Sequence, residues 1–577
     1  MDNRLEPLRQ KIAAARRQVE SDLVFKAAHV VNVFTGEILK ADVAVCRGTI
    51  VGVGPEYRGK LEIRAEGKWL LPGLMDAHFH VESSMMTPRR LAEALLVHGT
   101  TAIVGDPHEI ANVMGLPGIE FMLQDSRNIP FDIFFMAPSC VPATHLETSG
   151  AALEAPDILK LKNEPRILGL AEMMNFPGVL SGSAGVLEKI RVFENGIIDG
   201  HCPGLTGYDL QAYLSAGIGS DHETTQPQEA LEKLRGGMML MIREGTSAKN
   251  LEDLLPVIIR KNARRCCLVS DDLHPGDIAR RGHLNFLVKK AGRLGLDPIT
   301  AIRMVTLNPS TYFGFRDRGA VAPGFRADLV LLSDFENFKI DAVYKDGRQV
   351  VEEGSLVDFP KDTVVEFPSE SGRLQIGPLS MDDFAIRHPG GKAKVIEIIE
   401  GQVITRLITA SMPAKNGRVV ADTDGDILKL FVVERHRASG RIGKGLVKGL
   451  GLVKGAIASS VAHDSHNIIA AGVEDDAIFK AVTALADMGG GFAVVADGAV
   501  LAKVPLAIAG LMSREPLHTL VSQLNGVNGA ARGLGCGLHE PFMALSFVAL
   551  PVIPEIKLSD KGLVDVNRMQ LVPLFET

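Results

Sequence analysis

Cysteine, aromatic residues and long apolar segments are all scarce in this sequence. The 577 residues include six cysteines, too few for the disulfide framework of small secreted domains. Aromatic residues make up 5% of the chain, with a single tryptophan, which gives no stacking platform for single-stranded nucleic acid. No stretch supplies the roughly 18 uninterrupted apolar residues of a membrane span, and the charged N-terminal segment lacks the apolar core of a signal peptide. These absences predict a cytoplasmic protein without a membrane anchor.

A dominant charge of one sign is also missing. The 62 Lys and Arg residues against 69 Asp and Glu residues give a net charge of −7, and no long basic run occurs. Neither nucleic acid nor an anionic membrane is therefore an expected partner. Hydrophobic residues make up 46% of the chain, enough for large cores, and its length exceeds what one core usually organises. We expect a globular protein of two to four domains that binds a small molecule.

The pattern changes from helical to β-like early in the chain. Residues 22–72 are rich in Val and Ile and punctuated by glycine, and residues 321–360 return to the same pattern. We therefore expect one small β-sandwich domain made from both segments. Residues 1–21 place apolar side chains at helical spacing among charges, which predicts an amphipathic helix that packs on the body or on a partner. These apolar side chains are Leu5, Leu8, Ile12 and Val19.

Residues 73–320 alternate short apolar runs with segments of helical composition. Several of these runs end in His, Asp or Glu, and parallel barrels place their chemistry at the carboxyl ends of strands. The alternation predicts a (β/α)8 barrel of the TIM type, inserted in the β-sandwich domain. Residues 361–577 carry their own apolar runs and predict a separate C-terminal α/β domain, after a linker around Pro360 to Gly372. The predicted fold class is α/β.

The strongest chemical signal is a His-x-His pair that follows an apolar run. His78 and His80 lie two residues apart, so on a strand both imidazoles point the same way and can bind one metal. Each further candidate ligand, taken alone, could instead be a helix cap or a satisfied buried histidine. Their order at successive strand ends favours one common site. The further candidates are Glu172, His201, His222 and Asp271.

Four imidazoles and two carboxylates suit two divalent cations, with one carboxylate able to bridge them. Such a pair lowers the pKa of a shared water and gives a hydroxide nucleophile near neutral pH. Asp271 would accept the proton of that water and deliver it to a leaving group. The set predicts metal-assisted hydrolysis.

Other polar residues close to these ligands are candidate substrate contacts or supports of the ligands, and each can instead be a turn or cap residue. His463 and His466 in the segment HDSHN could bind metal, form part of a lid over the barrel mouth, or belong to a capped connection. The remaining candidates are Glu82, Ser83, Asp106, His108, Glu109, Glu223 and Asp272.

Several segments carry a resemblance to a known family. They include PGLMDAHFHVESSM (72–85), GTTAIVGDPHEIANV (99–113), GLAEMMNFPGV (169–179), DGHCPG (199–204), SDHE (220–223), SDD (270–272) and HDSHN (463–467). In these the chain resembles the amidohydrolase superfamily and, within it, the bacterial adenine deaminases, almost end to end.

The resemblance implies that Glu172 is the bridging ligand and that Asp271 shuttles protons. It further implies hydrolytic loss of ammonia from C6 of adenine, giving hypoxanthine in purine salvage, with Mn²⁺ or Fe²⁺ as the metal and Zn²⁺ as an alternative. Two other functions stay open: another amidohydrolase that opens a cyclic amide or deaminates a different heterocycle, and a non-catalytic scaffold of the same fold. A homo-oligomer, with a dimer as the first guess, is expected from the class of protein.

Overall fold

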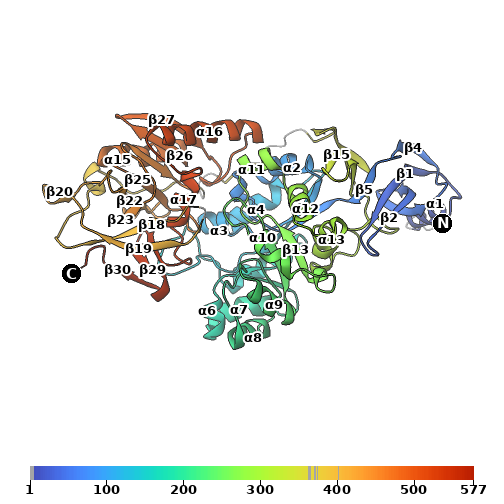
Figure 1. Ribbon diagram of the computed structural model, residues 1–577, viewed down its shortest axis with the longest axis horizontal. Helices are drawn as coiled ribbons and strands as arrows, with labels where there is room; N and C mark the ends of the chain where they lie inside the picture. The colour runs from blue at the N-terminus through green and yellow to red at the C-terminus, as the bar shows by residue number, and fades with distance from the viewer. Residues whose placement is uncertain (1–4, 361–364, 369–371, 373, 401, 577) are drawn as a thin grey trace.

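A computed structural model describes residues 5–360, 365–368, 372, 374–400 and 402–576. The fold is mixed α/β, and three regions follow one another along its longest axis (Figure 1). The N-terminal sheet lies at one end, parallel strands with their helices lie in the centre, and the C-terminal sheet lies at the other end (Figure 1). The predicted linker around Pro360 to Gly372 falls largely outside the described residues. Within the described ranges, no helix is both long and apolar enough to cross a membrane.

The N-terminal sheet has nine strands drawn from both ends of the first 360 residues. Strands β5 and β14 pair antiparallel, with Leu70 opposite Leu331, and so join the two segments. The Phe25 ring on β1 meets the Tyr344 ring on β15 at 4.8 Å, although three strand spacings of a flat sheet would separate them by about 14 Å. One curled sheet therefore encloses the core that a two-layered sandwich was expected to bury. Its strands are β1 (Ser21–Asn32), β2 (Glu37–Cys46), β3 (Thr49–Gly54), β4 (Gly59–Arg64), β5 (Trp69–Pro72), β14 (Leu329–Asp334), β15 (Lys339–Lys345), β16 (Arg348–Glu352) and β17 (Ser355–Leu356).

The N-terminal helix α1 (Glu6–Ala15) is shorter than expected and buries a different face. It ends before Arg17, whose φ of 59° leaves the helical region. Only Ala14 is buried, whereas the predicted apolar stripe is 46–57% exposed, so the expectation that this stripe packs on the body is wrong. The helix is held instead by a hydrogen bond from the Tyr57 hydroxyl to the Ala15 carbonyl. Contact of the stripe with a partner stays a prediction.

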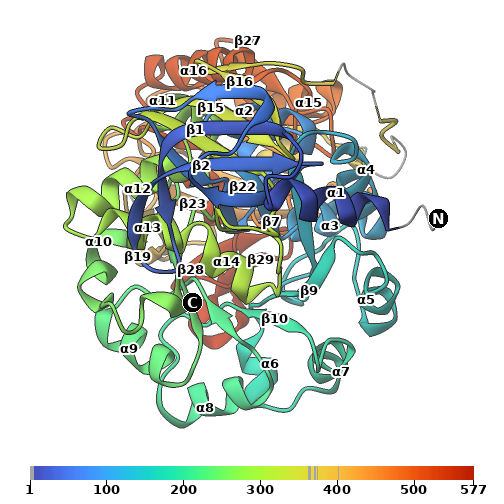
Figure 2. The same cartoon turned by 90° about the vertical axis from the view of Figure 1, so that its right-hand side faces the viewer.

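The central region contains a curled five-stranded parallel sheet, in the order β10-β9-β8-β7-β6, and a three-stranded parallel sheet, in the order β11-β12-β13. Helices cover these strands, and an arc of them is visible in the end view behind the N-terminal sheet (Figure 2). Burial on both faces explains why the strands read as continuous apolar runs. The strands are β6 (Leu74–Phe79), β7 (Thr100–Gly105), β8 (Asp132–Ala137), β9 (Ile167–Met173), β10 (Ile197–Gly200), β11 (Ser220–Asp221), β12 (Met239–Arg243) and β13 (Cys266–Val269).

The helices of this region connect consecutive strands or follow the last one. They are α2 (Pro88–Leu96), α3 (His108–Met114), α4 (Leu116–Asp125), α5 (Ala155–Leu161), α6 (Phe176–Leu180), α7 (Ala184–Val192), α8 (Gly207–Ser215), α9 (Pro227–Arg235), α10 (Leu251–Leu254), α11 (Pro275–Arg281), α12 (Leu284–Arg293), α13 (Pro298–Met304) and α14 (Leu307–Tyr312). Single 3-10 turns occur at Glu82–Ser84, Leu255–Val257 and Ala263–Arg265.

The C-terminal region is built on an eight-stranded sheet in the order β19-β18-β23-β22-β25-β24-β26-β27. All neighbours are antiparallel except β18 and β23. The sheet strands are β18 (Ala393–Ile398), β19 (Thr405–Ala410), β22 (Ile427–Val433), β23 (Ile442–Lys448), β24 (Ala456–Ser459), β25 (Ile468–Gly472), β26 (Gly491–Ala496) and β27 (Ala499–Pro505). The other elements are β20 (Ala414–Lys415), β21 (Arg418–Val419), β28 (Ile556–Ser559), β29 (Gly562–Asp565), β30 (Gln570–Val572), α15 (Asp475–Met488), α16 (Leu517–Gly533), α17 (Pro541–Val548) and 3-10 turns at Met381–Phe384 and Val566–Arg568.

The C-terminal region packs directly against the central strands and helices. The Asp560 carboxylate accepts hydrogen bonds from the Thr148 backbone N–H at 2.8 Å and hydroxyl at 2.7 Å. The Asn467 side chain donates to the Thr148 carbonyl at 2.8 Å, and the Ser513 N–H donates to the Met85 carbonyl at 2.8 Å. These bonds hold the C-terminal region against the loops that follow the parallel strands.

Candidate metal centre

All six predicted metal ligands lie together at the carboxyl ends of the parallel strands. They come from different strands because parallel strands end at a common edge. Each is buried except His201, whose side chain is 15% exposed. His78 lies in β6, His80 directly after β6, Glu172 in β9, His201 directly after β10, His222 directly after β11 and Asp271 two residues after β13.

Glu172 lies between imidazoles on two sides. Its Oε2 is 2.6 Å from Nδ1 of His201 and 3.1 Å from Nε2 of His222. Its Oε1 is 3.5 Å from Nε2 of His80. Burial opposes ionisation of Glu172, but the imidazoles of His222 and His201 outweigh it and hold its pKa well below the ordinary value. A charged carboxylate with its oxygens aimed apart can contact two cations at once.

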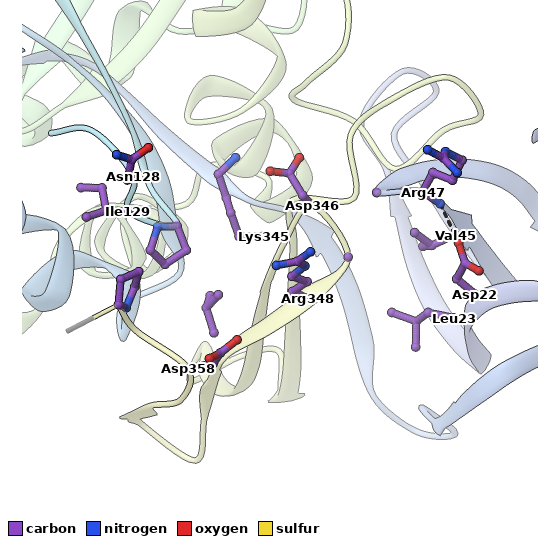
Figure 3. A pocket seen from close by; sticks show the side chains of 15 residues that line it. Asp22, Leu23, Val45, Arg47, Asn128, Ile129, Lys345, Asp346, Arg348 and Asp358 are labelled. Atoms are coloured by element: carbon purple, nitrogen blue, oxygen red, sulfur yellow. Dashed lines mark hydrogen bonds between the residues drawn. The ribbon is translucent and has the colours of Figure 1, made fainter. Parts of the chain in front are cut away.

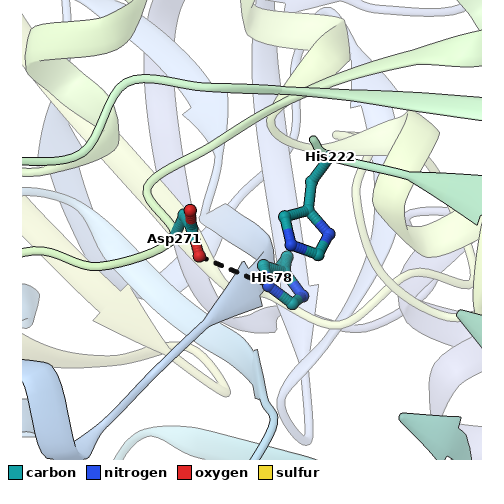
Figure 4. Close-up of side chains that lie close together, drawn as sticks. All are labelled: His78, His222 and Asp271. Carbon is teal, nitrogen blue, oxygen red and sulfur yellow. Dashed lines mark ion pairs between the residues drawn. The ribbon is translucent and has the colours of Figure 1, made fainter. Parts of the chain in front are cut away.

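Asp271 faces imidazoles with one oxygen and a guanidinium with the other. Its Oδ1 lies 3.2 Å from Nε2 of His80 and 3.5 Å from Nε2 of His78. The His78 ring stacks on the His222 ring, with 3.9 Å between the ring centroids (Figure 4). Oδ2 of Asp271 accepts a hydrogen bond from Nη1 of Arg243 at 2.9 Å. Burial raises the pKa of Asp271, but these three cationic or donor groups outweigh burial and lower it well below its usual range.

The imidazole nitrogens suit metal binding. Nδ1 of His80 lies 3.3 Å from the Asp106 carbonyl, which accepts its proton and leaves the Nε2 lone pair free. Nε2 of His78 is buried, and its contact with Oδ1 of Asp271 at 3.5 Å is too long for a well-formed hydrogen bond, a position that suits a bound cation. Three overlapping groups place their ligand atoms within 4.8 Å of one another. The groups are His78, His222 and Asp271; His78, His80 and Glu172; and Glu172, His201 and His222.

The candidate supporting residues fall into two sets. Glu82 accepts a hydrogen bond from the Ile110 N–H at 3.0 Å, and burial raises its pKa to about 7. The Ser83 hydroxyl donates to Asp272, and Glu223 forms a two-point ion pair with Arg243. These contacts hold side chains at the rim of the cluster.

The second set surrounds the start of α3. Nδ1 of His108 lies 3.3 Å from Oδ2 of Asp106 and 3.6 Å from Oε1 of Glu172. Glu109 contacts His463 and His466, so the HDSHN segment reaches this edge from the C-terminal region. The structure thus brings together every residue that the sequence singled out around the cluster.

The sequence-based selection missed several buried polar residues. Arg243 ends the run MMLMIR on β12, so the strand-end rule that found the ligands would have found it too. Asp76 holds the base of the cluster: it lies 3.0 Å from Nε2 of His283 and accepts the Ser270 N–H at 3.2 Å. Nδ1 of His283 in turn lies 2.7 Å from the Thr100 hydroxyl. These residues lie far apart in the sequence, so only their contacts in the structure show that they support the cluster.

A small cavity of about 60 Å³ lies over the cluster and adjoins one of about 800 Å³. Both cavities are lined by Arg243 and by apolar side chains of the C-terminal region. A separate cavity of about 910 Å³ lies between the N-terminal sheet and the central region, lined by residues such as Arg47, Lys345 and Arg348 (Figure 3). None of its lining residues belongs to the cluster, so this cavity is distinct from the candidate centre. We define the apolar roof as Val403, Phe547, Leu550, Val552 and Ile553.

Comparisons with known proteins give two family matches and similarities to solved structures. The family model described as Amidohydrolase family matches residues 69–350, and the model described as Adenine deaminase C-terminal domain matches residues 402–570. Among solved structures, the chain is similar to a β-aspartyl dipeptidase of Fervidobacterium islandicum AW-1, with a TM-score of 0.45 and 16% identity, over 59% of this chain and 99% of that chain.

Similarity to curated relatives extends over nearly the whole chain. An adenine deaminase of Desulfatibacillum aliphaticivorans is 52% identical, over 98% of this chain and 99% of the relative. An adenine deaminase of Dehalococcoides mccartyi is 48% identical with the same coverage. The chain belongs to the adenine deaminase family, within the amidohydrolases.

Proposed function

We propose that this chain is an adenine deaminase, which hydrolyses the bond between C6 and the exocyclic nitrogen of adenine and releases hypoxanthine and ammonia in purine salvage. The observation that carries the proposal is the position of Glu172, with one oxygen toward His80 and the other toward His201 and His222. The near full-length similarity to proteins named adenine deaminase supports the substrate.

The six-residue cluster would hold two divalent cations, with Glu172 between them. Imidazole and carboxylate donors accept Mn²⁺, Fe²⁺ or Zn²⁺, and our proposal takes Mn²⁺ or Fe²⁺ first, as the family resemblance implies. When bound, such cations lower the pKa of a water so that hydroxide is present near neutral pH.

The chain's own residues supply the remaining steps. Asp271 is ionised and buried, so it can take the proton of the attacking water and pass it to the departing ammonia. Arg243 keeps Asp271 ionised and fixes its orientation through the 2.9 Å hydrogen bond. The apolar roof lines the cavity over the cluster and offers a flat aromatic ring from Phe547 at its wall.

We further propose that β6–β13 together form an eight-stranded barrel spanning residues 73–320. Two backbone hydrogen bonds connect the edges of the two parallel sheets: Gly219 N–H to the Ile198 carbonyl at 2.9 Å, and Asp271 N–H to the His78 carbonyl at 3.1 Å. The remaining divisions would be residues 1–21, the composite domain of 22–72 and 321–360, and residues 361–577.

The direct test is ammonia release from adenine by protein loaded with Mn²⁺ or Fe²⁺ under reducing conditions, with hypoxanthine identified as product. Other purines, pyrimidines and hydantoins, tested in parallel, measure the alternative amidohydrolase activities. Release from adenine well above the others is expected. Full metal occupancy with no release from adenine would overturn the substrate, and absence of both metal and hydrolysis would favour a non-catalytic scaffold.

A further inference from the structure

The C-terminal region delivers two histidines to the edge of the candidate metal centre. The HDSHN segment (463–467) connects β24 to β25, and both imidazoles are buried. The ring of His463 stacks on Phe547 of the apolar roof at 5.0 Å, with 13° between the planes. The cavity over the metal cluster is lined by His463 together with His80 and Asp271. The segment therefore forms part of the wall facing the reacting centre.

Glu109 connects this segment to α3. Its Oε1 lies 2.6 Å from Nδ1 of His463, and its Oε2 contacts Nε2 of His466. All three residues offer atoms that could in principle hold a metal ion. The hydrogen bonds around His466 decide against that use.

The backbone of the HDSHN turn fixes the tautomer of His466. The Ala462 N–H donates to Nδ1 of His466 at 3.1 Å, so Nδ1 uses its lone pair and carries no proton. A neutral His466 then carries its proton on Nε2, the atom that contacts the Glu109 carboxylate. A protonated nitrogen cannot bind a metal, so His466 serves to hold the Glu109 carboxylate.

The carboxylate in turn orients His463. Nδ1 of His463 donates its proton to Glu109, and the stack on Phe547 fixes the plane of the ring. No hydrogen-bond partner for Nε2 of His463 occurs among the residues that the structure describes, and the side chain lines the cavity. A carboxylate that fixes one nitrogen of an imidazole presents the other to a reacting group in a defined direction.

We propose that Nε2 of His463 hydrogen-bonds to a ring nitrogen of the purine, so that the C-terminal region supplies a substrate-contacting catalytic residue. Glu109 and His466 are positioning residues for it. This inference rests on the proposed function, because it takes adenine as the bound molecule. A heterocycle with an acceptor or donor nitrogen in its ring is the chemical class that such a contact recognises.

Two substitutions of His463 separate the roles of its two nitrogens. His463→Asn keeps a donor near the Nδ1 position for Glu109 but loses Nε2, and we expect kcat/KM for adenine to fall about 10- to 100-fold. His463→Gln places an amide near the Nε2 position and should retain more activity than His463→Asn. Metal content per chain and thermal midpoint should match the wild type in both. The matched control is His518→Asn, an exposed histidine on α16 with wild-type kinetics expected.

Deazaadenines identify the contacted nitrogen. Inhibition constants of 1-deaza-, 3-deaza- and 7-deazaadenine are measured for the wild type and for His463→Asn. The analogue that lacks the contacted nitrogen should bind the wild type about 10- to 100-fold more weakly than adenine but lose little more in the variant, because the same bond is already absent. If the loss of affinity caused by each of the three analogues is the same in the wild type and in His463→Asn, the proposed contact is overturned.

The outcomes separate this inference from the proposed function. An active wild type with unchanged kinetics in His463→Asn overturns the inference and leaves adenine deamination standing. A lower metal content in His463→Asn would make the segment a metal site and also overturn the inference. A metal-loaded wild type that releases no ammonia from adenine contradicts the proposed function itself.

Discussion

Two buried clusters in this molecule use the same residue types in opposite ways. Glu172 and Glu109 each lie between imidazoles, and both carboxyl groups have pKa values held well below the ordinary range. In the first cluster, Nδ1 of His80 faces a carbonyl and so carries a proton, which frees Nε2 for a metal. In the second, Nδ1 of His466 faces an N–H, which places the proton on Nε2. The backbone around a histidine therefore decides between metal binding and hydrogen bonding.

The two imidazoles of the second cluster also differ in charge. Burial lowers the pKa of His466 to about 4, assisted by the nearby charge of Arg435. Burial likewise opposes protonation of His463, but Glu109 outweighs burial and raises its pKa to about 9. A neutral His466 beside a protonated His463 lets one carboxylate hold both rings.

Removal of metal is the largest expected perturbation, and it acts on the first cluster alone. Chelation should abolish ammonia release, a loss above about 10³-fold, and Mn²⁺ or Fe²⁺ should restore it. Each cation present at 100 times its dissociation constant also stabilises the fold by about 2.7 kcal/mol, so the thermal midpoint should fall. Activity assays and thermal scans before and after dialysis check both effects. Full activity in metal-free protein would contradict the metal-centre assignment.

Glu172→Gln and Glu109→Gln compare the two central carboxylates directly. Glu172→Gln should lower metal content and activity together, by about 10³-fold in kcat/KM, because an amide cannot supply the charge between two cations. Glu109→Gln should keep the metal content, since its imidazoles do not bind metal. Elemental analysis of both variants, beside the wild type, makes the comparison. Equal metal loss in the two variants would remove the distinction between the clusters.

Asp271→Asn tests proton transfer within the first cluster. We expect kcat to fall about 10²- to 10³-fold and KM to change less, because an amide cannot accept the proton of the attacking water. The loss of negative charge also leaves Arg243 with Glu223 as its carboxylate partner. Steady-state kinetics on metal-loaded protein gives the two constants separately. Unchanged kcat would exclude Asp271 from the proton-transfer role.

The strand-end rule carried most of the site prediction. It selected His78, Glu172 and Asp271 from the sequence because parallel strands bring their carboxyl ends to one edge, whatever their separation in the chain. The same rule applies to Arg243, which ends β12, but a guanidinium does not bind metal ions, so the predicted ligand set does not contain it. The role of His463 could not be read from the sequence, because Glu109 is 354 residues away and nothing in the local pattern specifies that contact.

Two features of the fold depend on neighbouring elements that a local sequence pattern does not specify. Helical spacing identified α1, but periodicity does not say which face meets the protein, and the structure buries Ala14 in place of the larger apolar stripe. Glycine-punctuated β-runs identified the composite sheet. They could not tell two layers from one curled sheet, because that depends on the pairing of β5 with β14.

Asp132→Asn removes a carboxylate that is paired with permanent cations instead of imidazoles, far from both clusters. Asp132 begins β8 and lies 2.7 Å from Nη1 of Arg318 and 2.8 Å from Nζ of Lys345, which joins the central region to the N-terminal sheet. Burial opposes its ionisation, but Lys345 and Arg318 outweigh burial and lower its pKa. We expect the variant to lose about 1–3 kcal/mol of stability with unchanged kcat.

The pH dependence of that loss follows from the sign of the pKa shift. The depressed pKa of folded Asp132 means that its stabilisation is complete above the unfolded pKa, near about 4, and is lost as pH falls through the lower folded pKa. The difference in unfolding free energy between wild type and Asp132→Asn should therefore be constant from about pH 5 to 7 and shrink toward pH 2. Denaturant titrations at several pH values measure it. A difference that grows on acidification would mean that Asp132 is not ionised in the folded protein. Its ion pairs with Arg318 and Lys345 would then not stabilise the fold.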